Sequence, residues 1–325
     1  MTRKTLGLTR KPAKNAKPES EEVGAAVDVE VETDPQKRFL NGVAINPAPG
    51  IRLESGSDKL TVRAMDLITP IGVGQRGLIV APPGSGKSTI LKDICQAVGK
   101  AYPEIKLYAL LIDERPEEVT DFKRSVPAEV HASSSDESYA NHARVADELL
   151  DTARQQAGEG HNVMIVIDSL TRLARVHNAE RKSSGRTMSG GVDARAMEIP
   201  RRLFGSARNL ENGGSLTILA TVLVDTGSRM DQVIFEEFKG TGNMELVLSR
   251  EVANQRIFPA LDISKSSTRR EELLLEPKDL DQIRALRRAL GGLKPLEGTT
   301  KLVELLEKYP TNAELLQNIP GAPIN

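Results

Sequence analysis

The stretch APPGSGKST (81–89) constrains the fold of this chain more than any other. It follows the short apolar run GLIVA (77–81) and leads into a segment of helical character that runs from about Lys87 to Lys100. A glycine-rich turn between a buried strand and a helix is the context of a phosphate loop, in which backbone N–H groups and the helix N-terminus surround phosphate oxygens. The sequence therefore predicts a nucleotide-binding α/β fold.

Each residue type in this phosphate loop (81–89) has an expected task. Lys87 is expected to reach the β- and γ-phosphates of ATP, and the Ser88 hydroxyl is expected to bind Mg²⁺. Glycine permits the close, partly left-handed backbone path of such a loop. The strict motif begins with glycine where this chain has Ala81. The loop residues predicted to contact ATP are Pro83, Gly84, Ser85, Gly86, Lys87, Ser88 and Thr89.

Strand-like and helix-like segments alternate along the chain. Apolar runs separated by long helices are typical of a parallel sheet covered by helices on both faces. The sequence thus predicts an α/β fold with a mainly parallel sheet and a small helical region at the C-terminus. Pro200 is expected to kink the second helix. The predicted strands are 77–81, 106–113, 162–170, 215–224 and 243–249, and the predicted helices between them are 134–156 and 193–209.

Two acids follow other predicted strands. Asp168 ends the run NVMIVID, where a carboxylate is costly without a cation partner, so it is the expected second ligand of Mg²⁺. A helix cap is the alternative role for Asp168. Glu114 ends LLIDE and is the candidate base that orients the attacking water. Ligands gather at the carboxyl ends of strands in open α/β sheets, which favours this pairing.

The composition excludes several classes of protein. No apolar run approaches the roughly 20 residues that cross a bilayer, and the N-terminus lacks a secretory signal. One cysteine and four histidines are too few for a multi-thiolate metal site or a disulfide framework, which favours the reducing cytoplasm. Residues 1–18 carry six basic residues and no acid, and residues 19–34 carry seven acids and no base. We therefore expect residues 1–35 to be disordered, with a basic tip that could touch nucleic acid.

Eight long runs of the chain are distinctive: IGVGQRGLIVAPPGSGKS, LLIDERPEEVTDF, VIDSLTRLARVHN, SGGVDARA, RRLFGSARN, GGSLTILAT, DTGSRMDQVIFEEFKGTGNMELVLSR and RIFPALDISKSSTRREELL. Through these runs the chain resembles transcription termination factor Rho over about residues 39–325. The resemblance implies a RecA-like P-loop ATPase that closes into a hexameric ring around RNA and acts as a helicase, with RNA polymerase as a candidate partner. We expect a tail (1–38), a connector (39–76), a RecA-like core (77–280) and a C-terminal helical region (281–325).

The resemblance also implies roles at the nucleotide. Lys87 and Ser88 match the Walker A residues, Asp168 the Walker B acid, and Glu114 the catalytic glutamate. Phe258 matches the aromatic residue that stacks on adenine. Three arginines match functional arginines of the family: Arg115 links nucleotide state to the RNA-facing loops, and Arg256 and Arg269 are offered to the nucleotide of the neighbouring subunit.

Two segments resemble the loops that grip RNA in the pore of the ring. The run RKSSGRTMSGGVD (181–193) matches the first pore loop, and DTGSR (225–229) matches the second. Glycine- and serine-rich loops with a basic residue suit contact with phosphates and 2′-hydroxyls. The residues expected to contact RNA are Arg186, Thr187, Gly190, Gly191, Asp225, Thr226, Gly227, Ser228 and Arg229.

The chain departs from the Rho pattern at several positions. Gly84 stands where the family usually has a lysine, which removes one cation beside the phosphates and is expected either to lower turnover or to alter the sensitivity to inhibitors. Arg186 and Arg229 stand where the pore loops usually have lysine. Only about 38 residues precede the matched region, with no barrel strands or stacking aromatics, so we expect the oligonucleotide-binding domain of the family to be missing.

Alternatives to an RNA-translocating motor remain open at this point. The same core could drive single-stranded DNA or a protein partner, or the chain could be a non-catalytic paralogue that regulates another ring. The retained Glu114, Asp168, Arg256 and Arg269 argue against a non-catalytic role. Rotary ATPase subunits share the core but lack the DTGSR and SGGVD runs.

Overall fold

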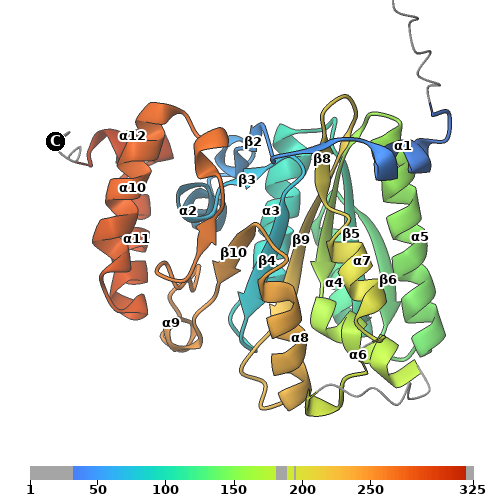
Figure 1. Cartoon of the computed structure of the whole chain (residues 1–325). Helices are drawn as coiled ribbons and strands as arrows, with labels where there is room; N and C mark the ends of the chain where they lie inside the picture. Colours follow the sequence, from blue (N-terminus) through green and yellow to red (C-terminus); the bar gives the residue numbers. More distant parts are fainter. Residues whose placement is uncertain (1–31, 181–188, 194, 320–325) are drawn as a thin grey trace, which may run out of the picture. The chain divides into compact units, whose positions relative to one another are not determined.

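The structure is a computed structural model that describes residues 32–180, 189–193 and 195–319, and a nine-stranded sheet lies at the centre of this part of the chain (Figure 1). Six strands run parallel in the order β10, β4, β9, β7, β5, β6. β11 pairs antiparallel with β10, and β8 joins β1 to β9 by antiparallel pairing. The strands are β1 (Ala44–Ile45), β4 (Arg76–Ala81), β5 (Lys106–Glu114), β6 (Glu129–Ser134), β7 (Asn162–Asp168), β8 (Arg208–Leu210), β9 (Ser215–Leu223), β10 (Met244–Val247) and β11 (Ser267–Thr268).

Helices cover both faces of this sheet, and a two-stranded sheet of β2 (Gly50–Ile51) and β3 (Ile71–Gly72) lies in the connector. One face packs on α2, α3, α4 and the C-terminal helices, and the other on α5, α6, α7 and α8. The mainly parallel, helix-covered fold predicted from the sequence is confirmed. The helices are α1 (Pro35–Asn41), α2 (Leu60–Ile68), α3 (Lys87–Ala101), α4 (Pro116–Ser125), α5 (Tyr139–Gly158), α6 (Leu170–Glu180), α7 (Glu198–Phe204), α8 (Arg229–Lys239), α9 (Arg250–Asn254), α10 (Pro277–Gly291), α11 (Pro295–Lys308) and α12 (Asn312–Gln317), with short 3-10 turns η1 (Leu53–Ser55), η2 (Ser189–Gly191) and η3 (Glu271–Leu273).

Strand β4 shows how the sheet divides the core. Its side chains alternate between faces, so Leu78 and Val80 enter the core under α5 to α8, whereas Ile79 and Ala81 enter the core under α2 and α3. All four are buried, as expected of a strand covered on both faces. This burial fixes the register of β4 and hence the place where the phosphate loop leaves the sheet.

A buried arginine joins the connector to the C-terminal helices. Arg63 of α2 donates hydrogen bonds to the carbonyls of Leu306 and Tyr309, both at 2.7 Å, and pairs with Glu54 at 3.1 Å. Its guanidinium is therefore satisfied inside the protein, as a buried charge requires. The C-terminal helices thus pack on the connector through these two hydrogen bonds and through the apolar core that they share with α2.

Three local predictions differ from the structure. Residues 129–134 form strand β6, and α5 begins only at Tyr139, because Ser138 caps it by accepting a hydrogen bond from the Asn141 N–H at 3.3 Å. The predicted helix 193–209 is limited to α7, Glu198–Phe204. Pro200 does not kink it, because Pro200 lies in its first turn, where a backbone N–H has no helical partner to lose.

The chain groups into two units, 1–32 and 33–325, and the fold described above belongs to the second. The predicted disordered tail lies almost entirely outside the described residues, although α1 begins at Pro35, inside the range 1–38 predicted for it.

Cys95 of α3 is buried in the core, and burial raises its thiol pKa to about 12, consistent with a structural role. Among the described residues, no helix has the length and apolar character needed to cross a membrane.

Candidate nucleotide site and pore loops

The phosphate loop leaves the carboxyl end of β4 and enters α3 through a turn that needs glycine. Gly84 has a φ of 77° and Gly86 a φ of 96°, a backbone conformation that favours glycine. Ser85 closes the turn, because its hydroxyl donates to the Pro82 carbonyl at 2.7 Å. The N-terminus of α3, with its partial positive charge, therefore faces the space that phosphates are predicted to fill.

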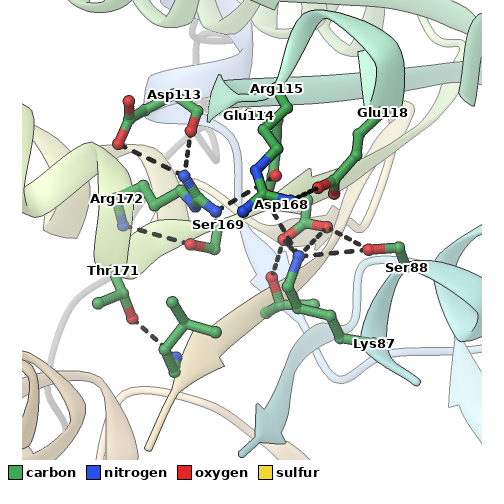
Figure 2. A network of polar contacts seen from close by, with 12 residues as sticks. Lys87, Ser88, Asp113, Glu114, Arg115, Glu118, Asp168, Ser169, Thr171 and Arg172 are labelled. Atoms are coloured by element: carbon green, nitrogen blue, oxygen red, sulfur yellow. Dashed lines mark hydrogen bonds and ion pairs between the residues drawn. The ribbon is translucent and has the colours of Figure 1, made fainter. Parts of the chain in front are cut away.

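Four side chains from three elements meet beside this loop and form what we call the Lys87 cluster: Lys87, Ser88, Glu114 and Asp168 (Figure 2). The Lys87 Nζ donates to Asp168 Oδ1 at 2.7 Å and Oδ2 at 2.6 Å, and to Glu114 Oε1 at 3.1 Å. The Ser88 hydroxyl donates to Asp168 Oδ2 at 3.1 Å. The tertiary fold thus gathers the predicted Walker residues and the predicted base, although 81 residues separate Lys87 from Asp168.

The strand between β4 and β7 also supports the cluster. Thr221 of β9 donates its hydroxyl to Asp168 Oδ1 at 2.9 Å. Ser169, and not Asp168, caps the following helix, because its hydroxyl accepts the Arg172 N–H at 3.2 Å. The Asp168 carboxylate is therefore free of the capping role and remains directed at Lys87 and Ser88 (Figure 2).

Burial dominates the electrostatics of the Lys87 cluster. Glu114 and Asp168 are each only 2% exposed. Burial and the neighbouring Asp168 carboxylate raise the pKa of Glu114, against the opposing effect of Lys87 and Arg172. Burial alone would lower the pKa of Lys87, but the two carboxylates outweigh it and raise that pKa. One ammonium group thus holds two buried carboxylates together.

The oxygen atoms of the cluster fit magnesium. A hydroxyl and a carboxylate oxygen, Ser88 Oγ and Asp168 Oδ2, lie 3.1 Å apart at the mouth of a glycine-lined loop. Mg²⁺ prefers oxygen ligands and usually takes only one or two from the protein, the rest coming from phosphates and water. Consistent with such a sparse donor set, the described residues contain no group of three or more His, Cys, Asp or Glu placed to hold a metal by themselves.

Arg172 belongs to this site, although no motif in the sequence predicts it. It lies on α6, one turn after Asp168, and its guanidinium donates to the Asp113 carbonyl (Figure 2). The same guanidinium lies 3.3 Å from Glu114 Oε2 and 3.5 Å from Asp113 Oδ2. Among the described residues, Glu114 Oε2 has this ion pair but no well-aligned hydrogen bond. In the sequence, the only feature that marks Arg172 is its position four residues after Asp168, the predicted Walker B acid.

The other nucleotide-related residues lie outside the Lys87 cluster. Phe258 is 43% exposed, and its ring lies beside the phosphate loop, 3.7 Å from where a Cβ on Gly86 would be. Arg115 pairs with Glu118 at 3.8 Å, and its side chain is 71% exposed (Figure 2). Arg256 and Arg269 are also exposed, and neither forms an ion pair with another described residue.

The described parts of the two predicted pore loops lie against each other. A Cβ on Gly190 would lie 2.8 Å from the carbonyl oxygen of Arg229, so only glycine fits at this contact. Asn178 of α6 holds the end of the first loop, since it donates to the Gly191 carbonyl at 3.2 Å and accepts the Asp193 N–H at 2.7 Å. Arg186 and Thr187 lie outside the described residues.

The second pore loop is tied to α6 through a buried acid. Thr226 donates its hydroxyl to Asp231 Oδ2 at 2.6 Å, and Ser228 caps α8 by accepting the Asp231 N–H at 3.4 Å. Arg175 of α6 donates through Nε to Asp231 Oδ1 at 2.8 Å. Asp225 has a φ of 54° at the start of the loop. One helix, α6, therefore contacts Glu114 through Arg172 and, through Arg175, contacts Asp231 of α8, to which Thr226 of the predicted second pore loop donates.

Replacing Gly190 by alanine is expected to destabilise the fold more than replacing Gly191. Both residues have a positive φ, 77° and 78°, so alanine costs about 1–2 kcal/mol of backbone strain at either position. A Cβ on Gly191 would meet nothing within 4 Å, whereas one on Gly190 would overlap Arg229. Thermal unfolding checks this, and equal midpoints for the two variants would contradict the packing of the loops.

The chain is similar in sequence to known proteins. The nucleotide-binding domain of the ATP synthase alpha/beta family matches residues 61–268. The chain is 51% identical to "Transcription termination factor Rho" of Streptobacillus moniliformis, over 82% of this chain and 65% of that protein. It is 47% identical to the Rho protein of Streptosporangium roseum, over 97% of this chain and 80% of that protein. The chain therefore spans about two thirds of the first relative and more of the second.

Solved structures share the fold. An ATPase from the type III secretion system of pathogenic bacteria matches with a TM-score of 0.69 at 24% identity, and the match covers 84% of each chain. The assembled ATPase EscN of enteropathogenic E. coli, in complex with its central stalk EscO, matches with a TM-score of 0.61 at 28% identity, over 77% of this chain and 59% of that one. At this level of identity the first likeness concerns the fold alone.

Proposed function

The chain belongs to the transcription termination factor Rho family, and from this premise we propose that it is an ATP-hydrolysing ring motor that moves single-stranded RNA through a central pore. The observation that carries the proposal is the position of α6. This helix begins two residues after Asp168, at Leu170, touches Glu114 through Arg172, and reaches the second pore loop through Arg175 and Asp231. A change at the nucleotide thus has a short physical path to the polymer.

Hydrolysis would require Lys87 to change partners. Its ammonium now bridges Asp168 and Glu114, and in the proposed reaction it moves to the β- and γ-phosphates. Ser88 and Asp168 would then hold Mg²⁺, which supplies neutralising charge on the phosphate oxygens. Release of Lys87 also frees the Glu114 carboxylate to accept a hydrogen bond from water and orient it for attack.

Arg172 would keep Glu114 in place during this exchange. Its ion pair with Glu114 Oε2 at 3.3 Å leaves Oε1, the oxygen that Lys87 now contacts, available to the water. Because the Asp113 carbonyl also accepts a hydrogen bond from Arg172, the guanidinium is fixed relative to the end of β5. A base held in this way needs little reorganisation when the water arrives.

The site would be completed between subunits. We propose that Phe258 stacks on adenine next to its own phosphate loop, and that the exposed Arg256 and Arg269 serve a neighbouring copy in a homohexamer. An arginine placed on the developing γ-phosphate charge contributes several orders of magnitude in rate. We propose that Arg115, exposed at the end of β5, transmits the state of the bound nucleotide to the pore. In the pore, Arg229 and the glycines of both loops would contact RNA phosphates.

The test is ATP hydrolysis with different polymers, alongside mass measurement of the oligomer. We expect poly(C) RNA to stimulate hydrolysis several-fold, poly(dC) to stimulate it far less, and the active species to have six subunits. Equal stimulation by DNA would favour a motor on single-stranded DNA, and absence of hydrolysis would favour a regulatory paralogue.

Because Gly84 replaces the usual lysine, turnover is expected to be low but measurable. We also propose that the protein acts in the cytoplasm together with RNA polymerase.

A further inference from the structure

A cavity of about 450 Å³, open to solvent, lies where the end of β5 meets the N-terminus of α5 and one side of α6. Strand β5 contributes Asp113, α5 contributes its cap Ser138 and its first residue Tyr139, and α6 contributes Arg175. A volume of this size is typical of small-ligand sites. None of the four residues of the Lys87 cluster lines it, so it is separate from the predicted phosphate site.

One buried side chain of this cavity has a polar atom that the protein does not use. His142 of α5 lines the cavity and is only 1% exposed. Its Nδ1 lies 2.7 Å from the Ser133 hydroxyl, whereas its Nε2 forms no hydrogen bond with a described residue. Nε2 is therefore the polar atom of this ring that a ligand in the cavity can reach.

The hydrogen bonds of Ser133 decide that Nε2 carries a proton. Ser133 is fully buried, and its hydroxyl oxygen accepts a hydrogen bond from Asn141 Nδ2 at 2.8 Å. Its own proton needs an acceptor, and within the described part of the chain His142 Nδ1 is the one in reach. An imidazole that accepts at Nδ1 donates at Nε2. The cavity thus presents an N–H donor, which requires a ligand with an acceptor atom.

The cavity also presents an acceptor. Asp113 pairs with Arg172 at 3.5 Å, but its carboxylate accepts no hydrogen bond from the residues that the structure describes (Figure 2). Glu137 lines the cavity too, and it already accepts the Ser134 N–H at 3.1 Å. Because the cationic Arg175 borders the same space, the lining favours a neutral ligand with both a donor and an acceptor over a free cation or anion.

An exposed aromatic ring stands at the same place. Tyr139 is 52% exposed although it begins a helix that packs on the core. Its ring centroid lies 6.2 Å from that of His142, so a flat ligand ring stacked on Tyr139 has its edge within reach of His142. Nucleobases are neutral flat rings with donors and acceptors on one edge, and they bind proteins by stacking on aromatic side chains.

We propose that this cavity binds one unpaired nucleobase, which stacks on Tyr139, accepts a hydrogen bond from His142 Nε2 and donates one to Asp113. Cytosine can meet all three conditions, because its N4 amino group is a donor and its ring offers acceptors beside it. The base would belong to the RNA strand in the pore, since Arg175 of the cavity wall contacts Asp231, which also binds the second pore loop. This origin of the base rests on the proposed function, whereas the base site itself does not.

The first test measures binding of cytidine to the full chain by saturation-transfer NMR, with the phosphate loop filled by a non-hydrolysable ATP analogue. Tyr139→Leu, which removes an exposed ring, should weaken cytidine binding about tenfold. Tyr139→Phe keeps the ring and is the matched control, so its affinity should stay within about twofold of the wild type. No binding of cytidine, or equal affinities for Tyr139→Leu and Tyr139→Phe, would overturn the proposal.

A comparison of ligands on the wild-type protein needs no variant. Pyrimidin-2-one riboside lacks the amino group of cytidine and cannot donate to Asp113, so it should bind roughly tenfold more weakly. Equal binding of the two nucleosides would contradict the predicted hydrogen bond and with it the proposed site.

A short cytidine oligoribonucleotide decides where the base comes from. Its binding, measured by fluorescence anisotropy, should be several-fold weaker for Tyr139→Leu than for Tyr139→Phe. If only free cytidine responded to the loss of the ring, the assignment to the RNA strand would be wrong and the ligand would be a nucleoside. If cytidine bound as expected while RNA neither bound nor stimulated ATP hydrolysis, the proposed function would fail and the base site would stand.

Discussion

The Lys87→Ala protein is expected to hydrolyse ATP at least about 100-fold more slowly than the wild type. In the structure, the Lys87 ammonium is the only cation within hydrogen-bond reach of Asp168 among the described residues, and it extends from the first residue of α3. No other lysine of the phosphate loop can replace it, because the family's second lysine position is Gly84 in this chain. Steady-state phosphate release at saturating ATP measures the effect.

A matched control exists on the same helix. Lys100→Ala removes an exposed lysine near the C-terminal end of α3, and it should change kcat by less than about twofold. If Lys87→Ala and Lys100→Ala retained similar turnover, the assignment of the phosphate loop as the catalytic nucleotide site would be wrong.

The Lys87→Ala substitution should also make the free energy of unfolding depend more strongly on pH. Without the ammonium, two buried carboxylates face each other, and the already raised pKa of Glu114 rises further. A carboxyl group whose folded pKa exceeds its unfolded value binds more protons when folded, so stability falls as the pH rises from its unfolded pKa toward its folded pKa. Without nucleotide, the unfolding midpoint of Lys87→Ala should therefore fall more than that of the wild type as the pH rises above 4.5, the ordinary pKa of the glutamate carboxyl.

The Glu114→Gln protein is expected to lose about 10²- to 10⁴-fold in kcat while it binds ATP normally. Glutamine keeps the shape of the side chain but cannot accept the proton of water. The folded protein should not become less stable, since the neutral amide removes the repulsion with Asp168. Rapid-quench hydrolysis and a separate nucleotide-binding measurement distinguish the loss of chemistry from the loss of binding.

The pH profile gives this prediction a second readout. In the wild type, kcat should decrease as the pH falls through the raised pKa of Glu114, because the base must be ionised to act. That acidic limb should be absent in Glu114→Gln. The control is Glu118→Gln, whose carboxylate is exposed and pairs with Arg115 at 3.8 Å, and kcat should change by less than about threefold. An equal loss of kcat in Glu114→Gln and Glu118→Gln would show that Glu114 is not the base.

Much of the fold could be read from local pattern. The run GLIVA followed by a glycine-rich turn predicted β4, the loop and the start of α3, because a strand buried on both faces and a helix N-terminus each have a short-range signature. The prediction missed β6, whose run EVHASS is short and partly polar and becomes a strand only through its pairing with β5. Strand propensity depends on such partners more than on the residues themselves.

The candidate site, like the fold, was only partly predictable from the sequence. Lys87 and Ser88 were predictable from the fixed spacing of the phosphate loop, and Glu114 and Asp168 because each ends an apolar strand. Arg172 was not, since an arginine on a helix after a Walker B acid has no signature of its own. Its contact with Glu114 exists only because β5 and β7 are adjacent in the sheet, which places the end of one strand beside the helix that follows the other.

By itself, the sequence determined that a phosphate loop connects a buried strand to a helix, that two acids end other strands, and that two glycine-rich loops carry arginines. These features depend on neighbours a few residues away, whose steric and hydrogen-bonding demands are local. Only the tertiary structure decided that one lysine bridges both acids, that Gly190 packs on Arg229, and that α6 touches both Glu114 and Asp231. Such contacts join residues far apart in the chain, and the order of strands in the sheet sets them.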